Sequence, residues 1–316
     1  MIARRLFLAA ALTLAAVPAL AQTPAAPAEK LPVVASFSIL GDFVKNVGGD
    51  RIALTTIVGP NGDSHVYQPT PADAKKIAAA KLVFVNGLGF EGWMDRLIKA
   101  SGSKAKVVVA TQGITPRERT ASEPQEEDDH KGGKGHAHDH GPIDPHAWQS
   151  IANAKVYVAN IRDALVAADP AGKAVYEANA TAYLAKLDAL DADVKAKIAA
   201  IPADRRIIIT SHDAFGYFGD AYGVKLLAPE GVSTETEASA KDVGRIIRQI
   251  KAQKVPAVFL ENVTNPKLVD RIAKESGAKV GGTLYSDALS DDKGPAATYI
   301  GMMQSNVREL SSALTS

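Results

Sequence analysis

Three histidines and one aspartate stand in segments whose residue types suit a metal ion. Each lies at a change from an apolar run to a polar loop, or from a loop to a helical stretch. They are His65 in VGPNGDSHVYQPTPAD, His146 in DPHAW, His212 in TSHDAFGYF and Asp287 in LYSDALS. Imidazole nitrogen and carboxylate oxygen bind Zn²⁺ at about 2.0–2.2 Å, and four such ligands complete a tetrahedron. These residue types indicate zinc and disfavour Mn²⁺, which prefers oxygen ligands.

A sphere of four protein ligands favours binding over catalysis. Catalytic zinc keeps one coordination position open for water, whereas four protein ligands close it. The chain contains no HExxH or GxSxG motif, and no Glu stands convincingly beside a candidate histidine. We therefore expect a metal-binding protein and not a secreted zinc hydrolase, and we assign no catalytic residue.

Plainer interpretations of the same residues remain open at this point. A single His65 or His212 is more often a hydrogen-bonded structural residue than a metal ligand. Asp287 is followed closely by two further aspartates, and Glu261, at the end of a predicted strand, is a rival fourth ligand.

Carboxylates near the candidate ligands could support them. Asp144 and Asp213 lie within two residues of His146 and His212 and could orient the imidazoles. Glu261 is a third candidate for such a contact. Asp144 and Asp213 could equally serve only as turn or cap residues, because Asp bonds its own backbone readily.

Short apolar runs alternate with helical stretches through most of the chain. This rhythm predicts an α/β fold with two lobes, each with a mainly parallel sheet flanked by helices. In open sheets of this kind, ligands gather at the carboxyl ends of the strands. His65, His212 and Asp287 follow predicted strands, so we expect one site shared between the lobes. The predicted strands are 33–38, 53–58, 82–87, 106–111, 206–211, 224–229, 257–262 and 279–285.

One long helix is expected to join the lobes. Pro170 and Pro202 bracket a helical stretch of roughly 30 residues, longer than the 8–20 typical of globular helices. Its apolar stripe comprises Tyr183, Leu187, Leu190, Val194 and Ile198. We place the N-terminal lobe at 33–168, the linking helix at 172–201 and the C-terminal lobe at 202–316.

Five of the seven histidines lie in the stretch EEDDHKGGKGHAHDHGPIDPHAW. The segment 115–141 has too few apolar residues to fold alone and is expected to be a mobile loop. Building a tight site there costs chain entropy, whereas histidine-rich tracts frequently bind metal. We interpret the loop as an accessory that captures zinc weakly, the alternative being a solvated acidic insertion. The accessory residues are His130, His136, His138, Asp139 and His140.

The first 21 residues have the three regions of a secretory signal peptide. Arg4 and Arg5 precede the apolar run 6–17, which is shorter than the roughly 20 residues of a membrane-spanning helix. Residues 22–32 are expected to form a flexible tether. The chain has no cysteine, so we expect neither a disulfide nor a lipid anchor, and a location free in the periplasm. Without Arg4 and Arg5, 34 basic residues face 35 acidic ones, so neither nucleic acid nor stable membrane insertion is indicated.

Six segments together resemble one protein family. They are SFSILGDFVKNVGGD, VGPNGDSHVYQPTPAD, NGLGFEGWMDRL, DPHAWQSIANAKVYVANI, SHDAFGYFGDAYGV and LYSDALS. The chain resembles, from about residue 33 onward, the zinc- and manganese-binding solute-binding proteins of bacterial ABC importers, the ZnuA/AztC-like group. The resemblance implies two α/β lobes joined by a rigid helix, a metal buried between them, and modest lobe movement on binding.

The resemblance also implies the ligands and the metal. It places the family's ligands on His65, His146, His212 and Asp287. Manganese-type relatives commonly carry Glu where this chain has His212, so the resemblance implies zinc. The chain departs from some members by lacking a cysteine pair and by having a short histidine segment.

The expected function is a periplasmic, high-affinity zinc-binding protein that captures one Zn²⁺ and delivers it to an ABC permease with its ATPase. We expect a monomer, with a periplasmic metallochaperone as a second partner and a weak second zinc site in the loop. Two alternatives are a manganese-specific homologue and a zinc buffer or chaperone without its own permease.

Overall fold

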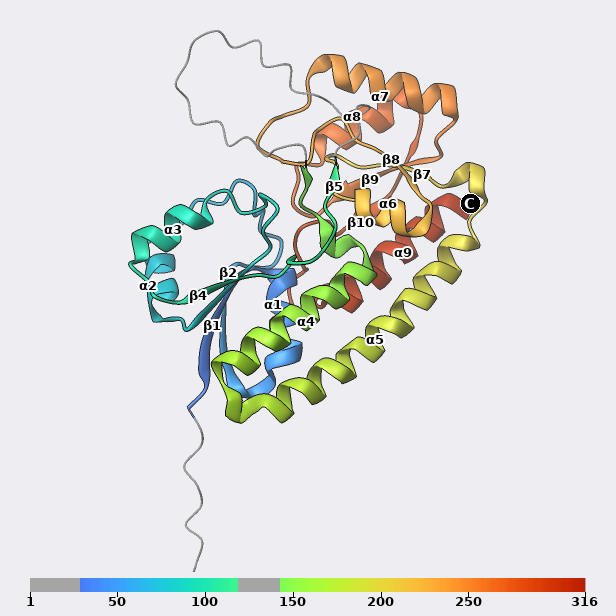
Figure 1. Ribbon diagram of the computed structural model, residues 1–316. Coiled ribbons are helices and arrows are strands. Elements are labelled where there is room, and N and C mark those ends of the chain that lie inside the picture. Colours follow the sequence, from blue (N-terminus) through green and yellow to red (C-terminus); the bar gives the residue numbers. More distant parts are fainter. Residues whose placement is uncertain (1–28, 119–142, 316) are drawn as a thin grey trace, which may run out of the picture.

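Two α/β lobes joined by a long helix make up the described part of the chain (Figure 1). The computed structural model describes residues 29–118 and 143–315. The signal peptide predicted at 1–21 and most of the tether predicted at 22–32 lie outside these ranges. So do the accessory residues His130, His136, His138, Asp139 and His140.

The N-terminal lobe is built on a parallel four-stranded sheet with the order β2-β1-β3-β4. The central strands are apolar runs because helices cover both faces of such a sheet. α2 begins at a capping box, in which the Thr70 hydroxyl accepts the Asp73 N–H and the Asp73 carboxylate accepts the Thr70 N–H. The elements are β1 Leu31–Phe37, α1 Ser38–Gly48, β2 Ile52–Val58, α2 Pro71–Ala79, β3 Leu82–Val85, α3 Met94–Ser101, β4 Lys106–Val109, β5 Arg117–Glu118 and β6 Ile143–Asp144.

A pair of long helices runs along one side of the molecule (Figure 1). α4 (Ile151–Ala168) turns at Pro170–Gly172 into α5 (Lys173–Ala199), whose 27 residues span about 40 Å. The buried stripe of α5 contains all five residues of the predicted stripe. The linking helix is therefore confirmed.

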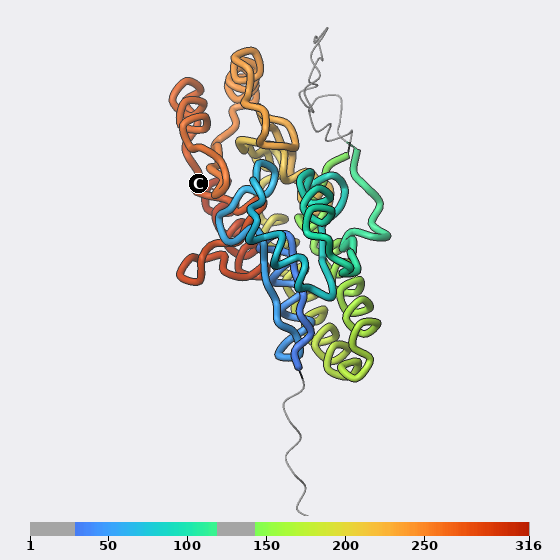
Figure 2. Tube along the Cα trace, turned by 90° about the vertical axis from the view of Figure 1, so that its left-hand side faces the viewer, coloured from blue at the N-terminus to red at the C-terminus, as the bar shows by residue number. Residues whose placement is uncertain are grey.

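The C-terminal lobe has a second parallel four-stranded sheet, with the order β10-β9-β7-β8. Figure 2 shows the orange helices of this lobe above the blue segments of the N-terminal lobe, with the red segments beside the blue ones. α6 and α8 both end at a glycine in the left-handed region, Gly223 and Gly277. The elements are β7 Ile207–Ile209, α6 Gly216–Tyr222, β8 Lys225–Leu227, α7 Ala240–Gln253, β9 Ala257–Glu261, α8 Lys267–Ser276, β10 Lys279–Leu284 and α9 Tyr299–Thr315.

One hydrophobic core runs through both lobes. Phe43 of α1, Tyr183 of α5 and Phe259 of β9 belong to the same cluster of buried side chains. Asp42 of α1 strengthens the junction, because its carboxylate accepts the backbone N–H of Tyr299 at the start of α9 at 3.0 Å. A second cluster packs α7 and α8 against the sheet of the C-terminal lobe.

Two predicted boundaries are wrong. The tether does not reach residue 32, because Leu31 and Pro32 of β1 already pair with Ile52 and Ala53 of β2 in the sheet of the N-terminal lobe. The loop predicted at 115–141 overlaps β5, because Arg117 and Glu118 pair antiparallel with Asp144 and Ile143. Apolar periodicity cannot detect a two-residue ladder of polar residues. The exact lobe limits 33–168 and 202–316 stay a prediction.

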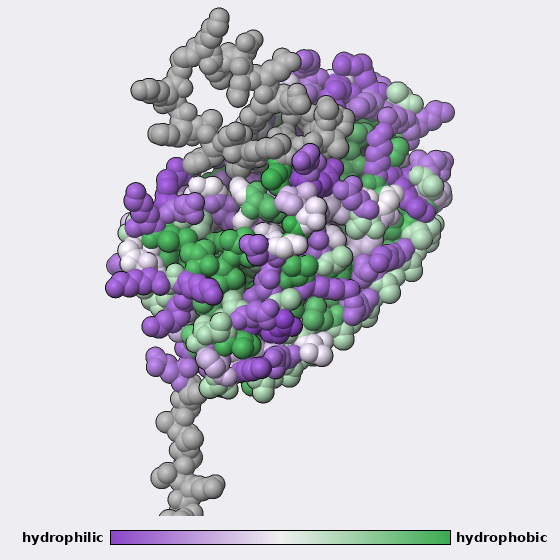
Figure 3. Space-filling model, viewed as in Figure 1, coloured by the Kyte–Doolittle hydropathy of each residue, from purple (hydrophilic) through white to green (hydrophobic). Residues whose placement is uncertain are grey.

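On the face shown in Figure 3, hydrophobic side chains gather over the N-terminal lobe, among polar ones. The edge strand β4 contributes to the exposed hydrophobic residues with Val107 and Val109, which are 41% and 39% exposed. None of the helices in 29–118 and 143–315 has both the length and the apolar character needed to cross a bilayer.

Candidate metal centre

The four candidate ligands meet at one point between the lobes. One ligand atom from each of His65, His146, His212 and Asp287 lies within 4.8 Å of all the others. His146, His212 and Asp287 are fully buried, and His65 is 3% exposed. These residues come from sequence positions up to 222 apart, so the fold assembles the cluster.

Each candidate ligand follows a strand in the chain, His65 at seven residues and the other three at two or three. His65 follows β2 through a loop, in which Asp63 accepts the His65 backbone N–H at 2.9 Å. His146 lies two residues after β6, while His212 and Asp287 each lie three residues after their strands, β7 and β10. All three parallel strands deliver their ligands from the carboxyl end, as predicted for open α/β sheets.

The N-terminal lobe also holds the loop that carries Asp287. The Trp148 indole donates to the carbonyl of Ser286 at 2.9 Å, and the Gln149 side chain donates to the same carbonyl at 2.8 Å. Ser286 stands next to the candidate ligand Asp287 of the C-terminal lobe. Its carbonyl is thus fixed by Trp148 and Gln149, which follow the candidate ligand His146 of the N-terminal lobe. This contact explains how a short Ser-Asp segment is kept in register with three histidines.

Four separations between ligand atoms are close to the edges of a tetrahedral site, in a group whose atoms all lie within 4.8 Å of one another. The Asp287 Oδ2 atom lies 3.2 Å from His212 Nε2 and 3.3 Å from His65 Nε2. His146 Nε2 lies 3.4 Å from His65 Nε2 and 3.5 Å from Asp287 Oδ1. A tetrahedron with metal–ligand bonds of about 2.0–2.1 Å has edges of about 3.3–3.4 Å. The Oδ1 atom of Asp287 is buried without a hydrogen-bond partner, as expected for an oxygen that a cation would satisfy.

Two carboxylates hold the outer nitrogens of the imidazoles. Asp144 Oδ1 lies 2.8 Å from His146 Nδ1 and accepts the His146 backbone N–H at 2.9 Å. Glu261 Oε2 lies 2.7 Å from His212 Nδ1, and its other oxygen accepts the His212 backbone N–H at 2.9 Å. With Nδ1 held in this way, the Nε2 atoms are directed towards the centre.

The remaining carboxylate predictions have different outcomes. Glu261 contacts the outer nitrogen of His212 and is not in the group of four, so its interpretation as the rival fourth ligand is not supported. Asp213 donates its backbone N–H to the Gly231 carbonyl at 3.0 Å. The predicted supporting role of the Asp213 side chain stays a prediction.

Opposing effects set the pKa of two imidazoles. Burial disfavours the cation of His146, but the charge of Asp287 and the hydrogen bond to Asp144 together outweigh burial and raise the pKa of His146 to about 9. Burial also lowers the pKa of His212. The charges of Glu261 and Asp287 outweigh burial and place the pKa of His212 well above its usual range.

His65 behaves differently from the other two histidines. Burial is the largest effect and lowers the pKa of His65 below its usual 6.5. Burial alone would raise the pKa of Asp287, but the charges of His146 and His212 outweigh it and hold this pKa well below the usual range. The Asp287 carboxylate is thus surrounded by two imidazoles whose pKa is raised and by one, His65, whose pKa is lowered.

Aromatic rings close the apolar side of the centre. The Phe90 ring lies 4.8 Å from the His65 ring and 4.8 Å from the Trp148 ring, both edge to face. Trp148 in turn packs against His146 at 5.3 Å. An apolar layer of this kind limits water access and lowers the local dielectric constant, which strengthens metal–carboxylate attraction.

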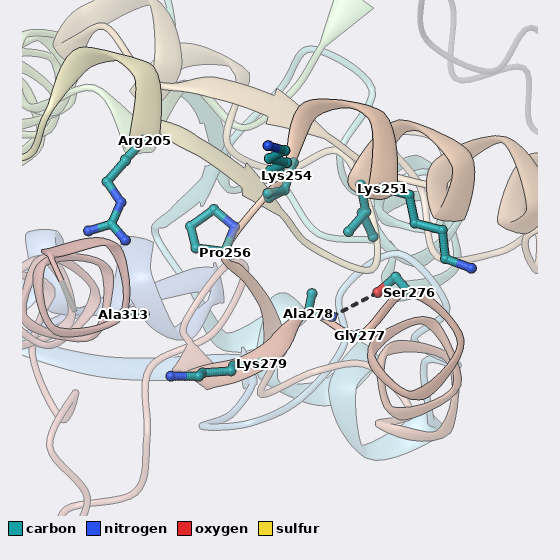
Figure 4. A pocket seen from close by; sticks show the side chains of 11 residues that line it. Arg205, Lys251, Lys254, Pro256, Ser276, Gly277, Ala278, Lys279 and Ala313 are labelled. Atoms are coloured by element: carbon teal, nitrogen blue, oxygen red, sulfur yellow. Dashed lines mark hydrogen bonds between the residues drawn. The ribbon is translucent and has the colours of Figure 1, made fainter.

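A hollow in the C-terminal lobe is lined by basic residues, in contrast to the candidate metal centre. It has a volume of about 470 Å³ and lies at the amino ends of β9 and β10, away from the strand ends that carry the ligands (Figure 4). Its charged lining residues are Arg205, Lys251, Lys254 and Lys279, and its lining includes no histidine or carboxylate. The lysines complement the carboxyl ends of α7 and α8. The positive charge of this lining disfavours a cation.

The fold and the buried cluster define a metal-binding solute-binding protein. The chain belongs to the ZnuA family, described as "Zinc-uptake complex component A periplasmic", which matches residues 33–313. Proteins of this family are extracytoplasmic solute-binding components of ABC transporters, working with a permease and an ATPase, and they are not enzymes.

Two curated relatives are named for different metals. The iron-binding protein YfeA of Yersinia pestis is 37% identical over 287 residues, covering 90% of this chain and 86% of that protein. The manganese-binding lipoprotein MntA of Halalkalibacterium halodurans is 35% identical over 287 residues, covering 91% of this chain and 89% of that protein.

Solved structures agree with the fold. The periplasmic zinc binding protein TroA from Treponema pallidum has a TM-score of 0.80 and 30% identity, covering 91% of this chain and 100% of that one. The Mn-bound periplasmic metal binding protein from Candidatus Liberibacter asiaticus has a TM-score of 0.76 and 32% identity, covering 90% and 98%. The family therefore confirms metal binding and the fold but not the metal.

Proposed function

We propose that this protein captures Zn²⁺ between its lobes and delivers it to the permease of an ABC importer. The proposed ligands are His65, His146, His212 and Asp287. The observation that carries this proposal is the buried cluster of three imidazoles and one carboxylate, in which four pairs of ligand atoms lie 3.2–3.5 Å apart. Zinc accepts such a set readily, whereas manganese prefers more oxygen ligands and higher coordination numbers.

Competitive titration of the metal-free protein tests the choice of metal. Zn²⁺, Mn²⁺ and Fe²⁺ are each titrated, the last without oxygen, against a chelator of known affinity. We expect one tight zinc ion per chain and much weaker binding of the other two. Tighter binding of manganese or iron than of zinc at the same pH would refute the proposed cargo and leave the family assignment intact.

We further propose that the exported protein works as a monomer without a lipid anchor. The name of the relative MntA describes a lipoprotein, whereas the 316 residues of this chain contain no cysteine. A cleavable signal peptide at 1–21 and release into the periplasm are consistent with this composition. Mass spectrometry of the mature N-terminus tests the cleavage of the signal peptide, and cell fractionation tests the release into the periplasm.

The histidine segment is proposed to capture zinc and pass it inward, directly or from a metallochaperone. Its support is compositional: His130, His136, His138 and His140 stand among acidic residues in the sequence. Acidic residues near a site raise the local concentration of cations and the rate of association.

Deletion of residues 123–140 is expected to slow zinc capture while leaving the affinity of the main centre unchanged. Loss of electrostatic attraction should reduce the association rate by roughly tenfold at low salt. Stopped-flow mixing measures the rate, and equilibrium competition measures the affinity. A variant with the four histidines changed to serine keeps the length and acidity, and thereby separates ligation from charge. Loss of tight binding on deletion would move the main site into the segment.

Glu261→Gln is expected to weaken zinc binding by about 10–100-fold. The carboxylate contacts His212 Nδ1 and accepts three further hydrogen bonds, from the backbone and hydroxyl of Ser211 and from the His212 backbone. The amide has one acceptor oxygen and carries no charge, so it holds the imidazole less well. Competitive titration measures the loss. Glu275→Gln on α8, whose partner is Arg271, is the matched control and should leave affinity unchanged.

A further inference from the structure

Arg117 lies behind one of the proposed zinc ligands, in a segment that sequence patterns assign to a loop. It is one of the two residues of β5 and pairs in register with Asp144 of β6. Its guanidinium Nη1 lies 3.4 Å from Asp144 Oδ2. The Arg117 side chain is 16% exposed and the Asp144 side chain is fully buried, so this ion pair is largely shielded from water.

Asp144 divides its two carboxylate oxygens between Arg117 and His146. Oδ1 lies 2.8 Å from His146 Nδ1 and accepts the His146 backbone N–H, while Oδ2 faces the guanidinium. A buried carboxylate that loses one partner is free to rotate and is poorly compensated. The guanidinium thus fixes the plane of the carboxylate, and the carboxylate fixes the imidazole.

Helix α6 of the C-terminal lobe packs closely against this pair. A Cβ atom at Gly216 would lie 2.5 Å from both Arg117 Cζ and Asp144 Oδ2, so any larger residue there would displace the guanidinium or the carboxylate. The Tyr217 hydroxyl accepts the Arg117 backbone N–H at 2.8 Å and donates to the Asp144 carbonyl at 3.2 Å. Arg117 Nε also donates to Asp220 Oδ2 at 3.1 Å. The pair is therefore fixed from both lobes.

We propose that Arg117 is a positioning residue for zinc binding, acting through Asp144 on His146. This proposal rests on the proposed function, because it requires His146 to be a ligand. Its geometric basis is the continuous contact from the guanidinium through one carboxylate to the outer imidazole nitrogen. The nitrogen at the opposite side of that ring, Nε2, lies in the cluster.

Three variants separate the parts of this arrangement. Arg117→Met removes the charge and the hydrogen bonds while keeping the length. Arg117→Lys keeps a positive charge opposite Asp144. Asp220→Asn removes only the ion pair with a carboxylate that is 69% exposed. Arg162→Met, on α4, is the matched control because Arg162 pairs with its exposed neighbour Asp163.

Zinc competition should show about tenfold weaker binding for Arg117→Met, towards the lower end of losses for residues that orient metal ligands. Arg117→Lys should recover most of that affinity, while Asp220→Asn and Arg162→Met should change it less than about twofold. Co²⁺, used as a spectroscopic probe, should lose part of its tetrahedral visible absorption in Arg117→Met. Thermal unfolding of each metal-free variant shows whether the fold is retained.

A double-mutant cycle with His146→Ala decides the mechanism. Once the imidazole is absent, Arg117→Met should cause no further loss of zinc affinity, because coupled residues are not additive. Equal losses in both backgrounds would overturn the positioning role. A loss of zinc affinity in Asp220→Asn as large as that in Arg117→Met would also overturn it, because the contact between the lobes would then explain the loss. If His146→Ala itself left affinity unchanged, the ligand assignment, and not only the role of Arg117, would be wrong.

Discussion

Replacing His212 by alanine is expected to weaken zinc binding by about 10²–10³-fold. Structural zinc sites bind with about 10–16 kcal/mol, so one of four ligands contributes about 3–4 kcal/mol. Each 1.4 kcal/mol corresponds to a factor of ten. The loss should lie at the upper end for His212, because Glu261 would keep its charge in a fully buried position without the imidazole it contacts.

Competitive titration against a zinc chelator measures this effect. His65→Ala and His146→Ala should show losses of similar size, because their Nε2 atoms lie at equivalent distances from Asp287. His138→Ala in the histidine segment is the matched control and should retain the main affinity. A histidine whose replacement left the affinity unchanged would be removed from the ligand set.

Zinc affinity is expected to fall steeply as the pH drops from about 9 to 6. The imidazoles must lose their protons before they ligate. The pKa of His146 is raised to about 9 and that of His212 lies well above the usual range, so both are protonated below these values. Zinc affinity therefore reaches its maximum only above the raised pKa values, where both imidazoles are neutral. It decreases by about two powers of ten per pH unit where both protons must leave.

Calorimetry in buffers with different ionisation enthalpies counts the protons released on binding. We expect about two per zinc at pH 7, because His65 is already neutral. Two protons leave as one dication enters, so the net charge of the centre, counted as the four ligand side chains together with the ion, is unchanged. Proton release near zero at pH 7, together with constant affinity from pH 7 to 9, would contradict the raised pKa values of His146 and His212.

The sequence predicted which four side chains the fold brings together, because each occupies a local context with its own signal. His212 and Asp287 each follow an apolar strand by three residues, and the carboxyl ends of parallel strands meet in such folds. The linking helix was equally accessible, because an apolar stripe repeats along its 27 residues. The same local signals placed Asp144 beside His146, although they could not distinguish an orienting contact from a turn.

Contacts between distant residues were beyond local patterns. Arg117 was assigned to a loop because β5 and β6 contain only two residues each and pair across an insertion. Trp148 was noted only as part of a motif, yet its indole fixes the Ser286 carbonyl of the other lobe. Such bonds depend on the arrangement of complete lobes. The one available signal for Arg117 was its place in the Arg-Glu-Arg run before an acidic stretch, which is too common a pattern to identify a partner.

The core that extends through both lobes makes the molecule a single cooperative unit for unfolding. Phe43, Tyr183 and Phe259 come from the two lobes and the linking helix, and they share one buried cluster. Neither half can separate without exposing apolar surface, which costs roughly 25 cal/mol per Å². Calorimetric melting should therefore show one transition. Zinc bound at the junction should raise that single melting temperature, because ligand binding stabilises every element that must be folded to form the site.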